Sequence, residues 1–252
     1  MTERLVLVAG ATGGVGQLVT AKLLEKDLKA RALVRNEAKA SQMFSDRLEK
    51  IELVVGDLRD RASLVPAVAG ITEIICCTGT TAFPSGKWDF ANLLQASNTP
   101  KEVDGVGVAN LVEVATEDLT RFVFVSSCGV ERKASFPFKL LNAFGVLDAK
   151  IQGETAIKNS GLPYTIIRPA RLIDGPYTSY DLNTLLQATT KGEKAVVLGT
   201  GDTLNGETSR IDVANACVEC LEHDTTINKA FELINKGDRS EMPSWAELFA
   251  QI

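Results

Sequence analysis

The stretch Gly10-Ala11-Thr12-Gly13-Gly14-Val15-Gly16 decides the fold of this chain. The apolar run Leu5 to Ala9 stands directly before it and is typical of a buried strand. The segment Val15 to Lys26 follows it, with apolar residues at helical spacing on one face. A glycine-rich turn between a first strand and a first helix is typical of a unit that binds the phosphates of a nucleotide.

Each spaced glycine of this turn has a physical role. Gly10 allows the tight turn, Gly13 lets backbone N–H groups approach a pyrophosphate, and Gly16 lets the helix pack on the strand. The positive end of the helix dipole adds to the attraction for an anion. We therefore expect the whole turn to bind a dinucleotide. The remaining residues expected to contact it are Thr12, Gly14 and Val15.

The alternation of strands and helices continues as far as Pro169. Strands separated by helical crossovers form a parallel sheet with helices on both faces. The sequence therefore predicts an α/β fold, a doubly wound parallel sheet of the Rossmann type. The predicted strands are Leu5–Ala9, Lys29–Val34, Ile51–Val55, Glu73–Cys77, Phe122–Ser126 and Tyr164–Ile167, and the predicted helices are Val15–Lys26, Glu37–Phe44, Arg61–Val68, Val103–Thr116 and Leu140–Asn159.

The pattern changes after Pro169, where a loop rich in glycine and proline begins. We interpret residues 1–252 as a single NAD(P)-binding Rossmann domain in which residues 169–252 contribute a small C-terminal lobe on the substrate side. The irregular segment Gly79–Pro100 lies at the carboxyl edge of the sheet, where α/β folds bind ligands. Further helices are predicted at Tyr180–Thr190, Ile211–Glu222 and Ser244–Gln251, and further strands at Ala195–Leu198 and Ala230–Leu233.

The second predicted strand is followed by Arg35, at a place where NAD-binding proteins usually carry Asp or Glu. Lys39 lies one helical turn further along. A guanidinium pairs bidentately with a phosphate and stacks on an adenine ring. The alternative is a solvated surface arginine, and Glu37, the nearest acid, lies past the strand. We therefore predict NADP(H) as the cofactor in preference to NAD.

Two further strand ends carry candidate cofactor residues. The Asp57 carboxylate could accept a hydrogen bond from the adenine amino group, with Leu58 against the ring. The alternative is that Asp57 caps the next helix, but Asp60 is better placed for that role. Thr78 and Gly79 end the fourth strand, where small residues let the backbone pass the cofactor.

The composition argues against several classes of function. A net charge of −5, without a run of basic residues, is unfavourable for binding nucleic acid. No segment reaches the roughly 18 apolar residues that span a bilayer. The start, Met1 to Arg4, leads directly into a strand and does not resemble a secretory signal. We expect a cytoplasmic protein, or a plastid stromal one if a transit peptide has been removed.

The five cysteines do not form a disulfide framework, because an odd number in a chain of this size is more typical of a reducing compartment. Cys217 and Cys220 have CxxC spacing inside a predicted helix, and we interpret them as partly buried helix residues. A metal site would need more ligands, and His223 is the only histidine. We predict no metal site.

Along essentially its whole length the chain resembles the short-chain dehydrogenase/reductase superfamily, specifically its atypical NAD(P)-binding branch. That branch includes flavin and biliverdin reductase-like proteins and plastid or cyanobacterial proteins. The strongest single stretch is Ser160-Gly161-Leu162-Pro163-Tyr164-Thr165-Ile166-Ile167-Arg168-Pro169, which looks like the family's sixth strand. Other carriers are Gly10 to Gly16, Leu33-Val34-Arg35, Gly56-Asp57-Leu58, Phe122 to Ser127, Lys150 with Glu154, Tyr164 to Ala170, and Ser209 to Ala214.

The resemblance implies roles for several residues. Typical members carry Tyr-x-x-x-Lys after the fifth strand, with the tyrosine as acid/base and the lysine lowering its pKa and reaching the nicotinamide ribose. Lys150 and Ser127 match the family lysine and serine and are the predicted catalytic residues, but Val146 stands at the tyrosine position. The resemblance also places further residues beside the cofactor, namely Ser126, Pro169, Ala170 and Arg171.

Two of these assignments have alternatives. Arg171 could meet a substrate carboxylate or a cofactor phosphate, or instead form a salt bridge, with Asp174 as a candidate partner. Ser209 and Arg210 precede a predicted helix, and the resemblance assigns them a structural role.

Val146 cannot transfer a proton, and three explanations remain open. Hydride transfer to a flavin or a linear tetrapyrrole needs no protein acid. Tyr177 or Tyr180 could replace the tyrosine. The protein could also bind NADPH as a redox sensor or assembly factor without catalysis. An epimerase of nucleotide sugars ranks last, because such enzymes need the tyrosine and a larger lobe. We favour an NADPH-dependent reductase.

Aromatic residues flank the expected site, which suits a flat, apolar small-molecule substrate. Packing of a lid is the alternative for these side chains. They are Phe83, Trp88, Phe90, Phe136 and Phe138.

Overall fold

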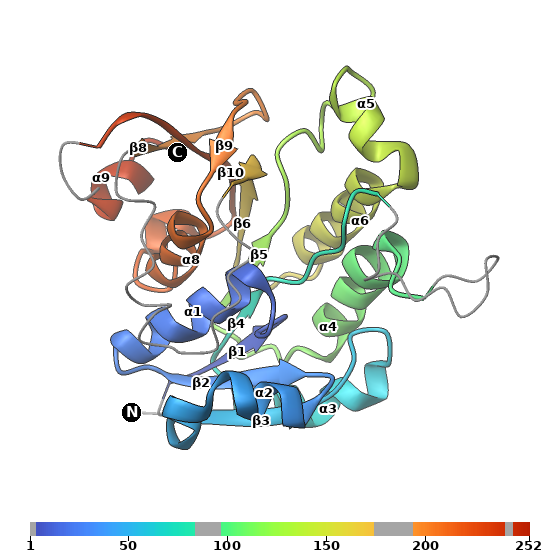
Figure 1. Ribbon diagram of the computed structural model, residues 1–252, viewed down its shortest axis with the longest axis vertical. Coiled ribbons are helices and arrows are strands. Elements are labelled where there is room, and N and C mark those ends of the chain that lie inside the picture. The colour runs from blue at the N-terminus through green and yellow to red at the C-terminus, as the bar shows by residue number, and fades with distance from the viewer. Residues whose placement is uncertain (1–3, 84–96, 174–193, 240–243) are drawn as a thin grey trace.

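The computed structural model describes residues 4–83, 97–173, 194–239 and 244–252 (Figure 1). The strands are β1 (Leu5–Ala9), β2 (Lys29–Val34), β3 (Ile51–Val55), β4 (Glu73–Cys76), β5 (Arg121–Val125), β6 (Tyr164–Pro169), β7 (Arg171–Leu172), β8 (Lys194–Gly199), β9 (Glu207–Thr208) and β10 (Lys229–Asp238). The α-helices are α1 (Gly14–Glu25), α2 (Glu37–Met43), α3 (Arg61–Val68), α4 (Val108–Val114), α5 (Phe138–Leu141), α6 (Val146–Asn159), α8 (Arg210–Glu219) and α9 (Trp245–Phe249). A π-helical segment, Lys101–Gly107, leads into α4, and short 3₁₀ segments lie at Ser45–Lys50, Asn142–Phe144 and Asp224–Thr226.

The sheet has the order β3-β2-β1-β4-β5-β6-β10, and all neighbours in this series are parallel. β8 and β9 pair with β10 in the antiparallel sense, and β7 pairs with β9. The strand order reverses between β1 and β4, which in open α/β sheets is where the ligand crevice forms. The predicted doubly wound parallel sheet is confirmed.

The first strand shows why the sheet is covered on both faces. Its side chains alternate between the faces. Val6 and Val8 join the hydrophobic cluster that contains residues of α1 and α8. Leu7 and Ala9 join a second cluster that contains residues of α3 and α4. Figure 1 shows α1 and α8 on one side of the strands and α3, α4 and α6 on the other.

Two predicted helices are wrong in their extent, and in place of the first, Val103–Thr116, the structure has the π-helical segment Lys101–Gly107 followed by α4. The segment Leu140–Asn159 was expected as a single helix, but it is divided into α5, a 3₁₀ turn and α6. Gly145 separates the last two with a left-handed φ of 76°. This conformation is easily adopted by glycine and stops the preceding turn. Val146 is therefore the first residue of α6.

The C-terminal region contributes a strand to the central sheet and a helix that packs beside α1. β10 is longer than the predicted Ala230–Leu233 and lies in the central sheet beside β6. Apolar residues of α8 share a hydrophobic cluster with those of α1. The predicted helix Tyr180–Thr190 lies outside the described residues, as do Trp88 and Phe90. In the described part of the chain, no helix is both long enough and apolar enough to cross a membrane.

Candidate cofactor and active site

The glycine turn is as tight as its spacing predicts. Gly10 has a φ of 80°, and a Cβ placed on it would lie 3.0 Å from the backbone nitrogen of Thr78. A Cβ on Gly16 would lie 2.1 Å from the carbonyl oxygen of Gly10, so a side chain at that position would force the turn apart. The Gly13 N–H donates to the Gly10 carbonyl at 2.8 Å. The turn therefore requires glycine at Gly10 and Gly16.

The N-terminus of α1 faces the carboxyl edge of the sheet at this turn. Gly13 is its N-cap and offers no capping side chain, and the first turn of α1 contains no acidic residue. The first N–H groups of a helix have no partner within that helix. These groups, with the positive end of the dipole, form a cradle that suits a pyrophosphate. The residues of the turn fit the cofactor that the sequence predicts.

Arg35 follows β2 and is exposed at the same edge. Its Nη1 donates to Oδ1 of Asn98 at 2.7 Å. The Asn36 side chain caps α2 by accepting a hydrogen bond from the backbone N–H of Lys39. This bond fixes the backbone position from which the exposed Lys39 side chain extends. Arg35 also contributes to lowering the pKa of the Asp57 carboxyl, so the two side chains face the same region.

Asp57 is not free, contrary to expectation. Arg59 donates to both of its carboxylate oxygens, at 2.9 Å from Nε and 2.6 Å from Nη2. These hydrogen bonds are the main reason that the pKa of Asp57 lies below its usual value. Asp60 caps α3, as predicted, by accepting from the Ala62 N–H. Leu58 is only 6% exposed and packs in the core.

We call the glycine turn and the ends of β2 and β3 the nucleotide side of the site, and the ends of β4, β5 and β6 with the start of α6 the reaction side. Lys150 is the central residue of the reaction side and is buried. Its Nζ donates to the carbonyls of Thr78 and Val125, both at 2.9 Å. It also forms an ion pair at 2.8 Å with Asp104 Oδ1.

Asp104 lies on the π-helical segment and is fully buried. Its Oδ2 accepts from the backbone N–H of Thr80 at 3.0 Å and from the Thr80 hydroxyl at 2.5 Å. The carboxylate thus connects Lys150 to the chain that leaves β4, next to Gly79. The expected contact of Lys150 with the ribose stays a prediction, and it would have to replace one of the three present partners.

Val146, at the position of the family tyrosine, lies in a small apolar cluster and is 9% exposed. The cluster contains Val130, Val146 and Leu147, with Ala82, Phe138 and Ile151 packed against it. Ser127 is half-buried beside this region, and its hydroxyl donates to the Cys128 carbonyl at 3.0 Å. The side chains of the cluster are apolar and offer no proton donor, so Ser127 is the residue of this group that carries a hydroxyl.

A second buried charge network lies below Ser126. The Ser126 hydroxyl donates to Glu154 Oε1 at 2.7 Å, and Arg168 binds both oxygens of the same carboxylate. Burial by itself would raise the pKa of Glu154, but the hydrogen bonds and charge of Arg168 outweigh burial and hold it below its usual value. Glu131 makes a further ion pair with Arg168 at 2.7 Å. Ser126 is thereby fixed at the end of β5.

The turn between β8 and β9 is attached by two buried carboxylates. Glu232, on β10, accepts from the backbone N–H groups of Asp202, Thr203 and Leu204, each at 2.7 Å. Asp202 in turn accepts from the N–H groups of Gly129 at 2.6 Å and Glu131 at 2.8 Å. Two carboxylates therefore connect β10, through this turn, to the loop that follows Ser127.

The chain after β6 is held by backbone contacts. Pro169 accepts from the Cys128 N–H at 2.9 Å, and the Ala170 N–H donates to the Thr208 hydroxyl at 2.9 Å. Arg171 is exposed and forms a salt bridge with Glu207. Asp174, the partner suggested from the sequence, lies outside the described residues.

The cysteines of the described residues are free thiols. Cys217 and Cys220 are fully buried on or at the end of α8, in agreement with a packing role. Burial raises the pKa of the Cys220 thiol to about 12, and that of Cys128, beside Ser127, also to about 12. A thiol with such a pKa is protonated near neutrality and is a poor nucleophile.

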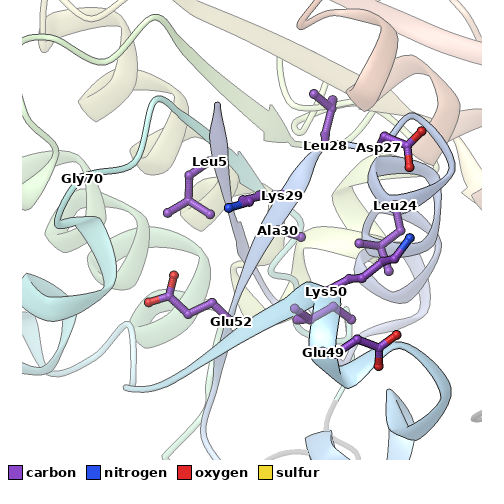
Figure 2. A pocket seen from close by; sticks show the side chains of 11 residues that line it. Leu5, Leu24, Asp27, Leu28, Lys29, Ala30, Glu49, Lys50, Glu52 and Gly70 are labelled. Atoms are coloured by element: carbon purple, nitrogen blue, oxygen red, sulfur yellow. The ribbon is translucent and has the colours of Figure 1, made fainter. Parts of the chain in front are cut away.

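A cavity of about 710 Å³ lies at the opposite edge of the sheet (Figure 2). It is lined at the amino ends of strands by Leu5, Lys29 and Ile51, which begin β1, β2 and β3. Its lining mixes apolar side chains with charges of both signs. Because the glycine turn is at the carboxyl ends of these strands, this cavity is not the cofactor site.

The fold and the glycine turn define a protein of the atypical short-chain dehydrogenase/reductase class. The family model described as NAD(P)H-binding matches residues 10–224, and the chain belongs to this family of oxidoreductases that bind a nicotinamide cofactor.

Curated relatives match nine tenths or more of this chain. An uncharacterized chloroplastic protein of Arabidopsis thaliana is 32% identical over 98% of this chain and 82% of its own length. Sanguinarine reductase of Eschscholzia californica is 30% identical over 98% of this chain and 95% of its own length. The photosystem II assembly factor Ycf39 of Trieres chinensis is 30% identical over 90% of this chain, which spans 63% of that protein.

Solved structures share the fold at lower identity. A putative NAD-dependent epimerase/dehydratase from Bacillus halodurans has a TM-score of 0.71 at 23% identity, covering 99% of this chain and 100% of that one. The anaerobilin reductase ChuY of Escherichia coli O157:H7 has a TM-score of 0.69 at 20% identity, covering 95% and 100%. A short-chain dehydrogenase/reductase from Veillonella parvula in complex with NADP has a TM-score of 0.67 at 16% identity, covering 96% and 99%.

The structure brings together residues that no sequence pattern marked. In the sequence, Asp104 lies in what looks like an ordinary amphipathic helix. Its carboxylate is buried because it pairs with Lys150, which is 46 positions away in the chain. Arg210 was assigned a structural role, yet its side chain lies over Gly14. The signal that could have found Asp104 is an acid near the start of the predicted helix Val103–Thr116, which also contains Glu113, and such a signal is weak.

Proposed function

We propose that this protein is an NADPH-dependent reductase that transfers hydride to a flat, conjugated small molecule without a protein acid. The observation that carries the proposal is the apolar cluster around Val146, in a chain whose glycine turn suits a dinucleotide. A bound nicotinamide cofactor supplies the hydride. An apolar wall would pack against a planar ring system but cannot donate a proton, so the proton that balances hydride addition would come from solvent or from the acceptor's own groups.

The preference for NADP is proposed from Arg35 and Lys39. Both are exposed at the end of β2, and the nearby acid, Asp57, is engaged by Arg59. This arrangement places the positive charge of Arg35 and Lys39 where a ribose phosphate would lie, and Arg59 neutralises the Asp57 carboxylate. The Veillonella structure was solved with NADP, which is consistent with this preference.

We propose distinct roles for the predicted catalytic residues. Ser127 would offer its hydroxyl to the substrate or the carboxamide at the reaction side. Lys150 would act by holding the Thr78 carbonyl and, through Asp104, the chain after β4, so that the floor under the nicotinamide is fixed. The other predicted contacts would come from the glycine turn, Thr78, Gly79, Ser126 and the Pro169–Arg171 turn.

The class of substrate is proposed from two observations. The wall formed by Val130, Val146 and Phe138 is apolar. Two similar proteins are named as reductases of sanguinarine and of anaerobilin. We propose an acceptor of this kind, a planar conjugated molecule. A plastid location is proposed in the same way, since the Arabidopsis relative is chloroplastic.

The first experiment separates binding from turnover. NADPH and NADH are titrated separately into wild type, Arg35→Ala and the control Arg61→Ala, which removes another exposed arginine. We expect Arg35→Ala to weaken NADPH binding about 10- to 100-fold, as for a lost charged hydrogen bond, and to leave NADH unchanged. Equal affinity of wild type for the two cofactors would contradict the NADP preference.

The second experiment tests the reaction. NADPH oxidation is followed with a flavin, a quinone, a bilin and an enone as acceptors. Turnover with at least one of them is expected, and Val146→Ala should alter KM more than kcat, because Val146 shapes the wall and moves no proton. Cofactor binding without turnover of any of these acceptors would contradict the proposed reductase activity.

A non-catalytic assembly factor is the second candidate, favoured by one observation. Phe136 is 86% exposed, and Leu140, Leu141 and Phe144 beside it are also exposed. Exposed apolar groups on one segment are typical of a protein interface. The similarity to an assembly factor agrees with this reading. It predicts NADPH binding without turnover, and loss of a co-purifying partner in Phe136→Ser.

A further inference from the structure

Arg210 is the first residue of α8, and its side chain crosses the glycine turn. A Cβ on Gly14 would lie 3.1 Å from Arg210 Nε and 3.2 Å from its Cδ. Gly14 is the first residue of α1. Arg210 therefore passes through the space that a side chain on Gly14 would fill, and its guanidinium group lies at the N-terminus of α1, the helix expected to bind the pyrophosphate.

The position of Arg210 is unfavourable for its own helix. A cation in the first turn of a helix opposes the helix dipole, whereas an acid or a polar cap is stabilising there. Ser209 caps α8, and Asn235 accepts from the Ser209 N–H at 2.7 Å, so the helix start is already secured. Asp212, the acid of the same turn, is bound by Asn235 at 2.7 Å and Arg239 at 2.6 Å.

We infer that Arg210 is a cofactor-positioning residue that supplies positive charge to the pyrophosphate across Gly14. The inference rests on the proposed dinucleotide site. Backbone N–H groups and the helix dipole bring only a partial charge to this place, and the first turn of α1 contains no basic side chain. Arg210 brings a full charge from α8 to the same helix end. It thus ties the C-terminal part of the chain to cofactor binding.

The test compares ligands that contain the pyrophosphate with one that lacks it. NADPH, NADH and adenosine 2′-monophosphate are titrated into wild type and Arg210→Gln. We expect Arg210→Gln to weaken NADPH and NADH equally, about tenfold or more, and to leave adenosine 2′-monophosphate unchanged. Arg35→Ala should give a different pattern. We expect it to weaken the binding of NADPH and of adenosine 2′-monophosphate and to leave the binding of NADH unchanged.

Two further variants separate this role from a structural one. Arg239→Gln removes an arginine that holds the same turn of α8 without reaching Gly14, and dinucleotide affinity should be unchanged. Gly14→Ala should displace Arg210 and weaken both dinucleotides in the same ratio, which keeps the inference testable if Arg210→Gln does not fold. Arg210→Lys should restore part of the affinity.

The outcomes distinguish the inference from the function on which it rests. Failure of wild type to bind either dinucleotide overturns the proposed function and the inference together. Normal binding by wild type with an unchanged Arg210→Gln variant overturns the inference alone. An equal loss of dinucleotide affinity in Arg239→Gln also overturns it, because the loss would then come from disturbing the start of α8 and not from removing the Arg210 charge.

Discussion

The nucleotide side and the reaction side of the site are built in different ways. The nucleotide side uses a continuous turn, residues 10–16, and residues just after β2, all within a short stretch of chain. The reaction side joins Asp104, Lys150, Glu154 and Arg168, which come from helices and strands far apart in the sequence. The first side leaves Arg35 and Lys39 exposed, whereas the second buries its charges against one another.

This difference has an energetic consequence. Exposed side chains such as Arg35 and Lys39 contribute little to the free energy of unfolding, so they are free to serve binding. A buried ion pair is costly to break, because removing one partner leaves a charge without compensation. We therefore expect substitutions on the nucleotide side to change affinity, and substitutions on the reaction side to change stability first.

The largest effect should follow loss of Asp104. Asp104→Ala leaves the ammonium of Lys150 buried without its carboxylate, and we expect the free energy of unfolding to fall by about 3–5 kcal/mol. Urea unfolding of wild type and variant measures the change. The control from the nucleotide side is Lys39→Ala, which should stay within about 0.5 kcal/mol. Similar losses in the two variants would break the contrast.

Loss of part of the Val146 side chain should have a smaller effect. Val146→Ala removes about two buried methylene equivalents, and we expect it to destabilise the protein by about 1.5 kcal/mol. Thermal and urea unfolding give the value. An unchanged stability would show that the wall contributes nothing to packing, and the reaction side would then resemble the nucleotide side.

Acid should act on the reaction side in a defined direction. The folded pKa of Glu154 is lower than its usual value, so its contribution to stability is present above the unfolded pKa and is lost as the pH falls through the folded pKa. In Glu154→Gln, the free energy of unfolding should fall less steeply than in wild type as the pH is lowered from neutral to acid. Glu247→Gln, an exposed carboxylate, is the control. Equal slopes in wild type and Glu154→Gln would refute this link.

The smallest effect concerns the buried thiol next to Ser127. Burial raises the pKa of Cys128 to about 12, so we expect it to react with iodoacetamide at neutral pH far more slowly than the same thiol in the unfolded chain. Mass spectrometry of tryptic peptides measures this. Rapid labelling of native Cys128 would show that the reaction side opens readily.

The part of the molecule that the sequence predicts is the part governed by local rules. The bounds of β1, β2, β3 and α3 agree with the predicted ones, because apolar runs end at glycine or polar residues there. The predicted helix Leu140–Asn159 runs through Gly145, whose left-handed conformation divides it. The burial of Asp104 and the contact of Arg210 with Gly14 depend on which helices pack together in the folded chain. The spacing of apolar residues along the sequence does not specify that packing.

The paired carboxylates of Asp202 and Glu232 have a consequence for motion. Five backbone amides, those of residues 129, 131, 202, 203 and 204, donate to these two side chains. A fluctuation that frees one carboxylate releases several amides together, so exchange of these protons with solvent should be concerted rather than independent. The loop beside Ser127 and the turn after β8 would then open on a common timescale, set by a residue of β10.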